Sequence, residues 1–307
     1  MSARTKPRSV SVSALALASL LPLAACATTL DYDTVAFSRY DLAPADDLDV
    51  VRKDFFRPYA NVLRRVVATG EGEQGLVDYE SLVADPEELE EAYARVAARS
   101  PRSHPDLFPT AEDQLAYWLN AYNLTVLRLV IDYYPIDSVH DVGSPLLFPG
   151  FLFEDGAGFF YWQEPVFGGE PMDLLTVENE IIRSEFDDPR IHFALNCAST
   201  GCPRLLPEPF DGASLSSQLD RATIEWFGEE RNLRVDDDGS VWMSQILDWY
   251  REDFLTWLDR NDPTAPRTLL EYAARHLDSA SAQRLRSLEP ESIRFVGYDW
   301  SLNRASR

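Results

Sequence analysis

One long segment of the chain is apolar on almost every side of a helix. It runs over residues 111–133, contains the sequence QLAYWLNAYNLTVLRLVIDY, and stops before Pro135. Thr110 is a suitable N-cap for it. A helix that is hydrophobic all round is buried, so we predict that this segment is the central helix of the fold.

Apolar residues at helical spacing predict five further helices, which bury one face each. The predicted helices start at Pro58, near Asp85, after Thr176 as the N-cap, at Leu215, and at Ile246 with an end near Leu258.

Strands are fewer and shorter. Residues 190–196 alternate between large apolar residues and others, residues 233–235 and 241–243 flank a DDDG turn as a hairpin, and residues 293–296 form a possible closing strand. Because helices and strands do not alternate regularly, we expect an α+β fold, with a single mostly helical domain around a small β-sheet.

The N-terminal sequence has the pattern of a signal peptide. Arg4, Lys6 and Arg8 precede an apolar stretch over residues 10–25, as in a secretory signal peptide. That stretch is shorter than the ~20 residues needed to span a bilayer.

The leader ends in Leu23-Ala24-Ala25-Cys26, which resembles the lipobox of bacterial lipoproteins. The resemblance implies that Cys26 is diacylated and becomes the first residue of the mature chain in the bacterial cell envelope. Ala27 in place of Asp favours the outer membrane, facing the periplasm. We therefore expect residues 1–25 to be a signal peptide, residues 26–47 a tether, and residues 48–307 one globular domain.

The net charge of the chain limits the classes of partner that it can bind. The whole chain has a net charge of −23, and since residues 1–25 hold three basic and no acidic residues, the rest carries −26. Nucleic acid and anionic lipid surfaces need basic patches, so we expect no nucleic acid and only a lipid-anchored contact with the membrane. We predict no metal or other cofactor.

Candidate chemistry gathers in DPRIHFALNCASTGCP, residues 188–203. Cys197 can be a thiol nucleophile with His192 as its base. Alternatively, His192, Cys197 and Cys202 can bind zinc, although a C-x2-C pair and a fourth ligand are lacking. Cys197 and Cys202 can also form a disulfide, or Cys197 can be a small buried residue. The residues alone leave these alternatives open.

Polar residues elsewhere need an explanation too. Asn120 and Asn123 lie in the buried helix, where an unsatisfied amide costs about 1–3 kcal/mol. We predict that both are buried and hydrogen-bonded outside their own helix, to irregular backbone or in a polar cavity. Glu178 and Arg183 are five residues apart and so are not close neighbours on an α-helix.

Several segments together are similar to the family known as domain of unknown function 547. They are AYWLNAYNLTVLRLVIDYYP, LTVENEIIR, DPRIHFALNCASTGCP, ILDWYREDF and YDWSLN, within residues 77–303. The resemblance implies no reaction. It does imply recurring positions, including Trp118, Asn120, Tyr122, Asn123, Glu178, Arg183 and Cys197. Many relatives have Glu-His where this chain has Glu178-Asn179.

Two functions remain. One is an envelope lipoprotein with a polar pocket for a ligand or partner, to which Asn123 and Arg183 contribute. The other is a thiol-dependent hydrolase or transferase acting on peptide or amide bonds, with Cys197 as nucleophile, His192 as base and Asn120 or Glu178 orienting. Both lead us to expect that Glu178, Asn120 and Cys197 converge on one cavity.

Overall fold

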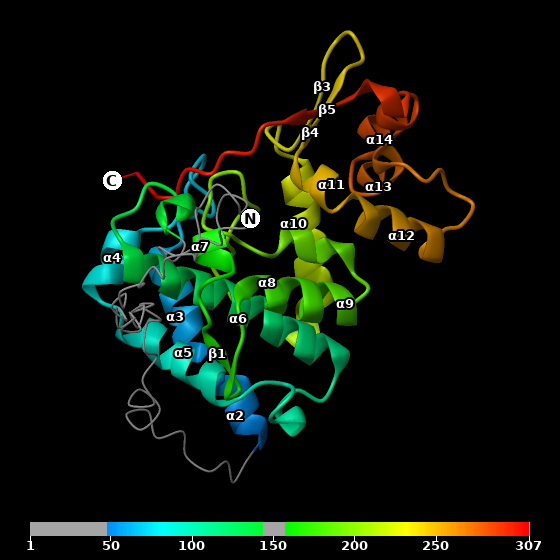
Figure 1. The fold of residues 1–307 in the computed structure, drawn as a ribbon. Helices are drawn as coiled ribbons and strands as arrows, with labels where there is room; N and C mark the ends of the chain where they lie inside the picture. The colour runs from blue at the N-terminus through cyan, green and yellow to red at the C-terminus, as the bar shows by residue number, and fades with distance from the viewer. Residues whose placement is uncertain (1–47, 144–156, 307) are drawn as a thin grey trace, which may run out of the picture.

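The computed structural model describes residues 48–143 and 157–306 (Figure 1). The predicted signal peptide, the tether and Cys26 lie outside these ranges. Among the described residues, no helix is both long and apolar enough to cross a membrane.

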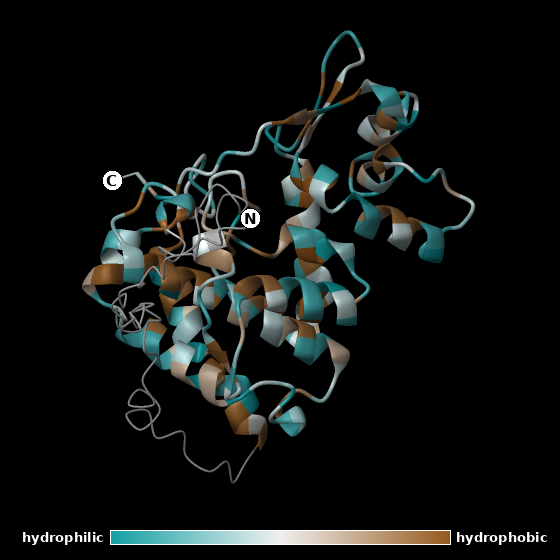
Figure 2. Cartoon of the chain, viewed as in Figure 1, coloured by the Kyte–Doolittle hydropathy of each residue, from teal (hydrophilic) through white to brown (hydrophobic). Residues whose placement is uncertain are grey.

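The first hydrophobic cluster is helical and contains the predicted central helix. That helix is α6, Ala111–Tyr133, and its capping box is formed by Thr110 and Asp113. Around it lie α2 (Leu48–Asp54), α3 (Arg57–Val66), α4 (Tyr79–Ala84), α5 (Glu87–Ala98), α7 (Ala157–Phe160), α8 (Leu174–Thr176) and α9 (Arg183–Glu185). Helix α6 is buried over most of its length, as its sequence predicts, whereas several surrounding helices carry separate hydrophobic and hydrophilic stripes (Figure 2).

The second hydrophobic cluster is formed by the C-terminal part of the chain together with the end of α10 (Leu215–Phe227). It contains α11 (Ile246–Trp249), α12 (Arg251–Asn261), α13 (Leu269–Ala274) and α14 (Ser279–Arg286), and the strands β3 (Leu233–Val235), β4 (Val241–Ser244) and β5 (Ile293–Val296). The predicted hairpin of β3 and β4 is confirmed, and β5 pairs with β4 in parallel. A second, two-stranded sheet of β1 (Val166–Phe167) and β2 (Glu170–Pro171) was not predicted. The fold is α+β, as expected.

Residues 246–258, predicted as one helix, are interrupted at Tyr250. This residue ends α11 and precedes α12, with φ −104° and ψ 21°. Its hydroxyl donates a hydrogen bond to Glu178. The Tyr250 side chain therefore reaches Glu178, whose neighbour Val177 belongs to the first cluster.

The prediction of a strand at residues 190–196 is wrong. Residues Pro189–Phe193 form a 3-10 helix, η5, because Pro189 starts the turn and the Asp188 carboxylate accepts from the Arg190 amide. The alternating pattern is misleading here because residues 191–196 are buried regardless of side-chain type: Ile191 packs in the first cluster and Phe193 in the second.

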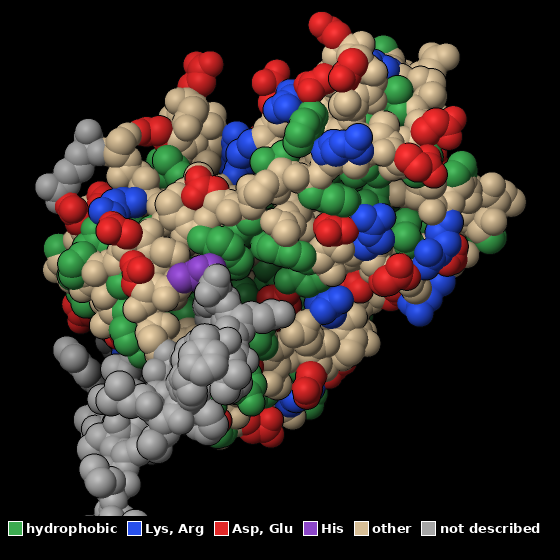
Figure 3. Space-filling view, turned by 45° about the horizontal axis from the view of Figure 1, so that its top comes forward, with side chains coloured by type: hydrophobic (Ala, Val, Ile, Leu, Met, Phe, Trp, Pro, Cys, Tyr) green, Lys and Arg blue, Asp and Glu red, His purple; other side chains and the backbone are tan. Residues whose placement is uncertain are grey.

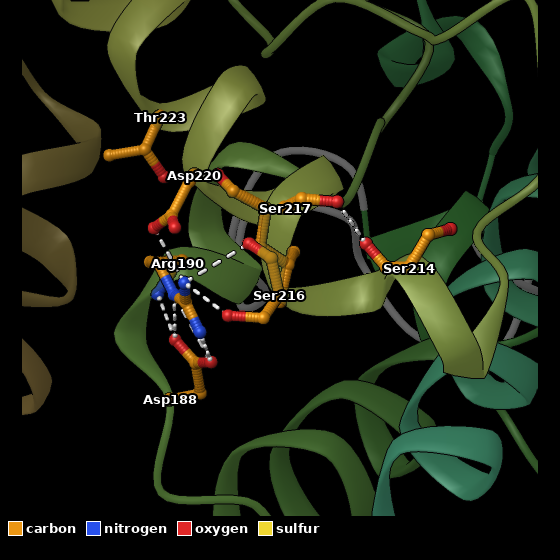
Figure 4. A network of polar contacts seen from close by, with 8 residues as sticks. Asp188, Arg190, Ser214, Ser216, Ser217, Asp220 and Thr223 are labelled. Carbon is orange, nitrogen blue, oxygen red and sulfur yellow. Dashed lines mark hydrogen bonds and ion pairs between the residues drawn. The ribbon is translucent and has the colours of Figure 1, made fainter.

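Arg190 fastens η5 to the neighbouring helix. Its guanidinium pairs with Asp188 at 2.6 Å and with Asp220 on α10 at 2.6 Å, and it donates to the Ser216 carbonyl at 3.3 Å (Figure 4). The segment that carries His192 is thus held at its start by an ion-pair network.

The helix predicted to begin at Thr176 starts earlier and has a different form. Asp173 is the N-cap and accepts from the Thr176 amide at 2.8 Å. Residues Val177–Ile182 then form a π-helical turn, in which the amide of Arg183 donates to the carbonyl of Glu178. Residues five apart are therefore hydrogen-bonded neighbours, contrary to the expectation from α-helical spacing.

The C-terminal segment, residues 298–305, returns to the first cluster. It makes isolated bridges to three separate places, pairing Ser301 with Ser138, Leu302 with Ser199, and Arg304 with Val77. In Figure 1 this segment is the red chain that leads from β5 back toward α4. The C-terminal segment thus connects the second cluster to the first.

The two buried asparagines of α6 bind backbone outside their helix, as predicted. Asn120 donates to the Phe210 carbonyl and accepts from the Phe210 amide, both at 2.8 Å. Asn123 donates to the Ala194 carbonyl at 2.9 Å and accepts from the Asn196 amide at 2.8 Å. Each amide thus fixes one irregular segment against the central helix.

We predict that Asn120→Ala lowers the free energy of unfolding by about 2–4 kcal/mol, because it leaves a buried amide and a buried carbonyl without partners. Urea denaturation monitored by circular dichroism measures this change. Asn261→Ala is the control, since Asn261 is exposed and its amide binds only its own helix. An equal loss of unfolding free energy in the two variants would contradict the role of Asn120 in fixing the segment at Phe210 to α6.

Candidate functional site

A pocket with a volume of about 130 Å³ lies where the two clusters meet. Its lining is mainly aromatic and aliphatic, and all of it except Phe160 comes from the segments that resemble the family: Tyr122, Phe160, Leu175, Leu195, Pro203, Ile246, Trp249, Tyr250, Tyr298 and Trp300. Glu178, His192, Cys197 and Cys202 complete it. Figure 3 shows hydrophobic side chains gathered around a hollow on this face of the molecule.

Glu178 is buried, with 7% of its surface exposed, and its carboxylate accepts two phenol hydrogen bonds. Tyr122 on α6 donates to Oε2 at 3.1 Å, and Tyr250 donates to Oε1 at 2.5 Å. Burial, and then the nearby Glu178 charge, raise the pKa of both tyrosines far above the usual value. Both phenols therefore stay protonated at neutral pH and serve as donors.

His192 lies against the same tyrosine. Its ring stacks on Tyr250 with the centroids 3.9 Å apart, and its Nε2 lies 2.8 Å from Oδ2 of Asp253. Burial lowers the pKa of His192 below its usual value, although the Asp253 hydrogen bond opposes this. At neutral pH the imidazole is thus uncharged and donates from Nε2 to the carboxylate.

Asp253 is shared between His192 and Arg183. Arg183 binds it with both Nε at 2.8 Å and Nη2 at 3.0 Å. Burial opposes ionisation of Asp253, but the hydrogen bonds from His192 and Arg183 outweigh burial and hold its pKa well below the usual range. Arg183 also donates to Asn179, so its guanidinium is engaged outside the pocket lining.

Cys197 and Cys202 form a disulfide with 6.1 Å between their Cα atoms. The Tyr298 hydroxyl lies 3.0 Å from Sγ of Cys197 and 3.1 Å from Sγ of Cys202, and 2.9 Å from the Ser199 hydroxyl. The disulfide is one of the alternatives that the sequence left open. Neither sulfur is then a thiolate, so two of the three residues proposed as zinc ligands, Cys197 and Cys202, cannot bind zinc in this form.

The loop closed by the disulfide contains a backbone outlier. Ala198 has φ 59°, a left-handed conformation that costs a non-glycine residue roughly 1–2 kcal/mol. The Asn196 side chain compensates by accepting from the Ala198 amide at 3.0 Å and donating to the Pro203 carbonyl at 2.7 Å. The surrounding contacts thus hold the loop in one shape.

The structure brings together three of the predicted site residues. Glu178, His192 and Cys197 line one pocket, whereas Asn120 is bound to Phe210 and is not part of the lining. Asn123 likewise binds backbone and positions the loop before Cys197. The expected convergence of Glu178, Asn120 and Cys197 is thus correct for Glu178 and Cys197 only.

Sequence reasoning missed most of the aromatic lining and Asp253. Trp249, Tyr250 and Asp253 lie in ILDWYREDF, and Tyr298 and Trp300 lie in YDWSLN. Both segments carried the family resemblance without being assigned to a site. The feature of the sequence that could have indicated a site in these two segments is the presence of aromatic residues next to acidic ones.

Within the described ranges, no group of three or more His, Cys, Asp or Glu residues is arranged to hold an ion. The arrangement instead offers a mainly apolar cavity with a fixed carboxylate and a neutral imidazole, which is suited to binding a small molecule in one orientation.

No curated protein and no solved structure matches the chain. Residues 108–227, which include α6, Glu178, His192 and the disulfide, match the family model described as "Protein of unknown function, DUF547". This part of the chain is therefore similar to the domain of unknown function 547.

Proposed function

We propose that this protein is a lipid-anchored envelope protein that binds a small ligand without covalent chemistry in the pocket around Glu178. The observation that carries this proposal is the composition of the pocket, in which aromatic walls surround one buried, hydrogen-bonded carboxylate. Mostly apolar cavities with a few convergent polar groups are typical of ligand sites.

The thiol-dependent hydrolase is the weaker candidate. In its favour, His192 is oriented by Asp253 and lines the same pocket as Cys197, which resembles the arrangement of a nucleophile, a base and an orienting acid. Against it, the nucleophile must be a thiolate, and Cys197 is bonded to Cys202. An oxidising compartment, such as the envelope, preserves such a bond.

The anchoring part of the proposal rests on the leader. Cys26 directly follows an apolar stretch that begins after three basic residues. Two acyl chains on one cysteine give stable membrane attachment, whereas one chain is marginal. The net charge of −26 beyond the leader keeps the attached domain away from anionic lipid.

Binding is tested with three aromatic probes of similar size: 2-phenylethanol, 2-phenylethylamine and 3-phenylpropanoate. We predict that at least one binds the purified full-length protein, and that Leu175→Trp weakens its affinity by roughly tenfold or more, because Leu175 lines the pocket and the larger ring takes up space in it. Isothermal titration calorimetry without reductant measures the affinity.

The matched control is Ile224→Trp, which makes a similar change at an exposed apolar position outside the pocket. Its affinity should equal that of the unmodified protein. If none of the three probes binds, or if both tryptophan variants weaken binding equally, the pocket is not a ligand site.

Anchoring is tested with Cys26→Ser. We predict that this variant is found in the soluble fraction, because it cannot be acylated. Membrane fractionation followed by immunoblotting measures the distribution, with Ala27→Ser as a control that keeps the cysteine. Unchanged membrane attachment of Cys26→Ser contradicts lipidation at this residue.

A further inference from the structure

We propose that the pocket selects a small ligand carrying a cationic ammonium group, which Glu178 binds directly while the surrounding aromatic rings cover it. This inference rests on the proposed ligand-binding function and specifies its ligand class. It is carried by the unfilled hydrogen-bonding capacity of Glu178, by the aromatic wall, and by the distribution of charge around the pocket.

Glu178 has no salt-bridge partner among the described residues, and the positive charge of Arg183 acts on it only at longer range. Its two hydrogen bonds come from the neutral phenols of Tyr122 and Tyr250, and no basic side chain in the described ranges forms an ion pair with it. A carboxylate has about four lone-pair sites, so two phenols leave acceptor capacity for a ligand. Burying a carboxylate is costly unless a charged partner compensates, and an ammonium group supplies both the charge and the donors.

The basic groups nearest to Glu178 are already engaged. Arg183 makes two hydrogen bonds with Asp253 and one with Asn179, and its guanidinium lies 4.9 Å from the Tyr250 ring centroid. His192 donates to Asp253, and burial lowers its pKa, so it carries no charge at neutral pH. Neither group neutralises Glu178 from within the pocket.

Another part of the pocket lining is a group of three rings, Trp249 from α11 and Tyr298 and Trp300 from the C-terminal segment. The centroids of Trp249 and Tyr298 are 4.9 Å apart, those of Tyr298 and Trp300 are 4.5 Å apart, and those of Trp249 and Trp300 are 6.0 Å apart. The faces of such rings attract cations, tryptophan most strongly, and aromatic enclosures are a recurring way to bind ammonium groups. The wall thus complements the same charge that Glu178 complements.

The other ligand charges are disfavoured. An anion would meet the Glu178 carboxylate in a poorly solvated site, where like charges repel strongly. The acidic chain as a whole also repels anions and attracts cations to its surface. A neutral ligand would occupy the apolar walls but leave the carboxylate without a countercharge.

The test compares the same three probes, which share an aromatic ring and differ in charge. With the full-length protein, calorimetry should give the highest affinity for 2-phenylethylamine, a lower one for 2-phenylethanol and the lowest for 3-phenylpropanoate. Glu178→Gln should weaken binding of the amine by about tenfold or more and change binding of the alcohol much less, because it removes the negative charge while keeping the size of the side chain and one acceptor oxygen.

Glu180→Gln is the matched control. It removes the same charge from the same π-helical turn, but Glu180 is exposed and does not line the pocket. Its affinity for the amine should match that of the unmodified protein. An equal loss in both variants would mean that the general charge of the chain, rather than Glu178, attracts the amine, and would overturn the inference.

A second variant guards against misfolding of Glu178→Gln. Trp249 is about half exposed, so Trp249→Leu can be made without opening the core. It should lower the affinity for the amine by roughly threefold relative to the affinity for the alcohol, because it removes an aromatic face while keeping an apolar side chain. Equal effects on amine and alcohol contradict the aromatic part of the inference.

The outcomes separate the two proposals. If the alcohol or the acid binds as tightly as the amine, and Glu178→Gln has no effect on the amine, the pocket binds ligands but the ammonium class is wrong. If no probe binds, the proposed function fails and the inference fails with it.

Discussion

The Glu178 carboxylate is held between phenols from two separate parts of the chain. Tyr122 comes from the central helix of the first cluster, and Tyr250 comes from the break between α11 and α12 in the second. A buried carboxylate must keep its donors, so the two clusters are fixed relative to each other where these bonds meet. The π-helical turn at Glu178 and the interruption at Tyr250 are the local distortions found at the two ends of this contact.

Other contacts stiffen the same boundary. Arg183 and His192 share Asp253, which links α9 and η5 to α12. Asn123 fixes the start of the loop that the disulfide closes, and the C-terminal segment pairs with that loop at Ser199. The pocket walls are therefore set before any ligand arrives, which lowers the entropic cost of binding.

The parts of the fold that follow from local pattern were predictable from sequence. Helix α6 was predicted from its long apolar run and its N-cap, and the hairpin of β3 and β4 from the turn residues between its strands. Residues 190–196 were wrongly predicted as a strand. Residues 191–196 are all buried, so their alternation of large apolar and other side chains does not reflect alternating burial and exposure. Tyr250 shows a different limit: its break depends on a partner 72 residues away, which no local pattern contains.

The candidate site was predictable only as a set of residue types. Glu178, His192 and Cys197 were singled out as polar or reactive residues in recurring segments, and they do meet. Asn120 looked equivalent in sequence, yet its amide is used to hold Phe210. Asp253 and the aromatic wall were missed because their roles arise from contacts between distant segments, such as the stacking of His192 on Tyr250.

The central claim is that the pocket binds through Glu178 and does not react through a thiol at Cys197. The most direct measurement is labelling of the protein, purified without reductant, with an alkylating thiol reagent, followed by peptide mass spectrometry. The account predicts that Cys197 and Cys202 are recovered as one disulfide-linked peptide pair without label. Rapid labelling of Cys197 in the unreduced protein would contradict it and favour the thiol enzyme.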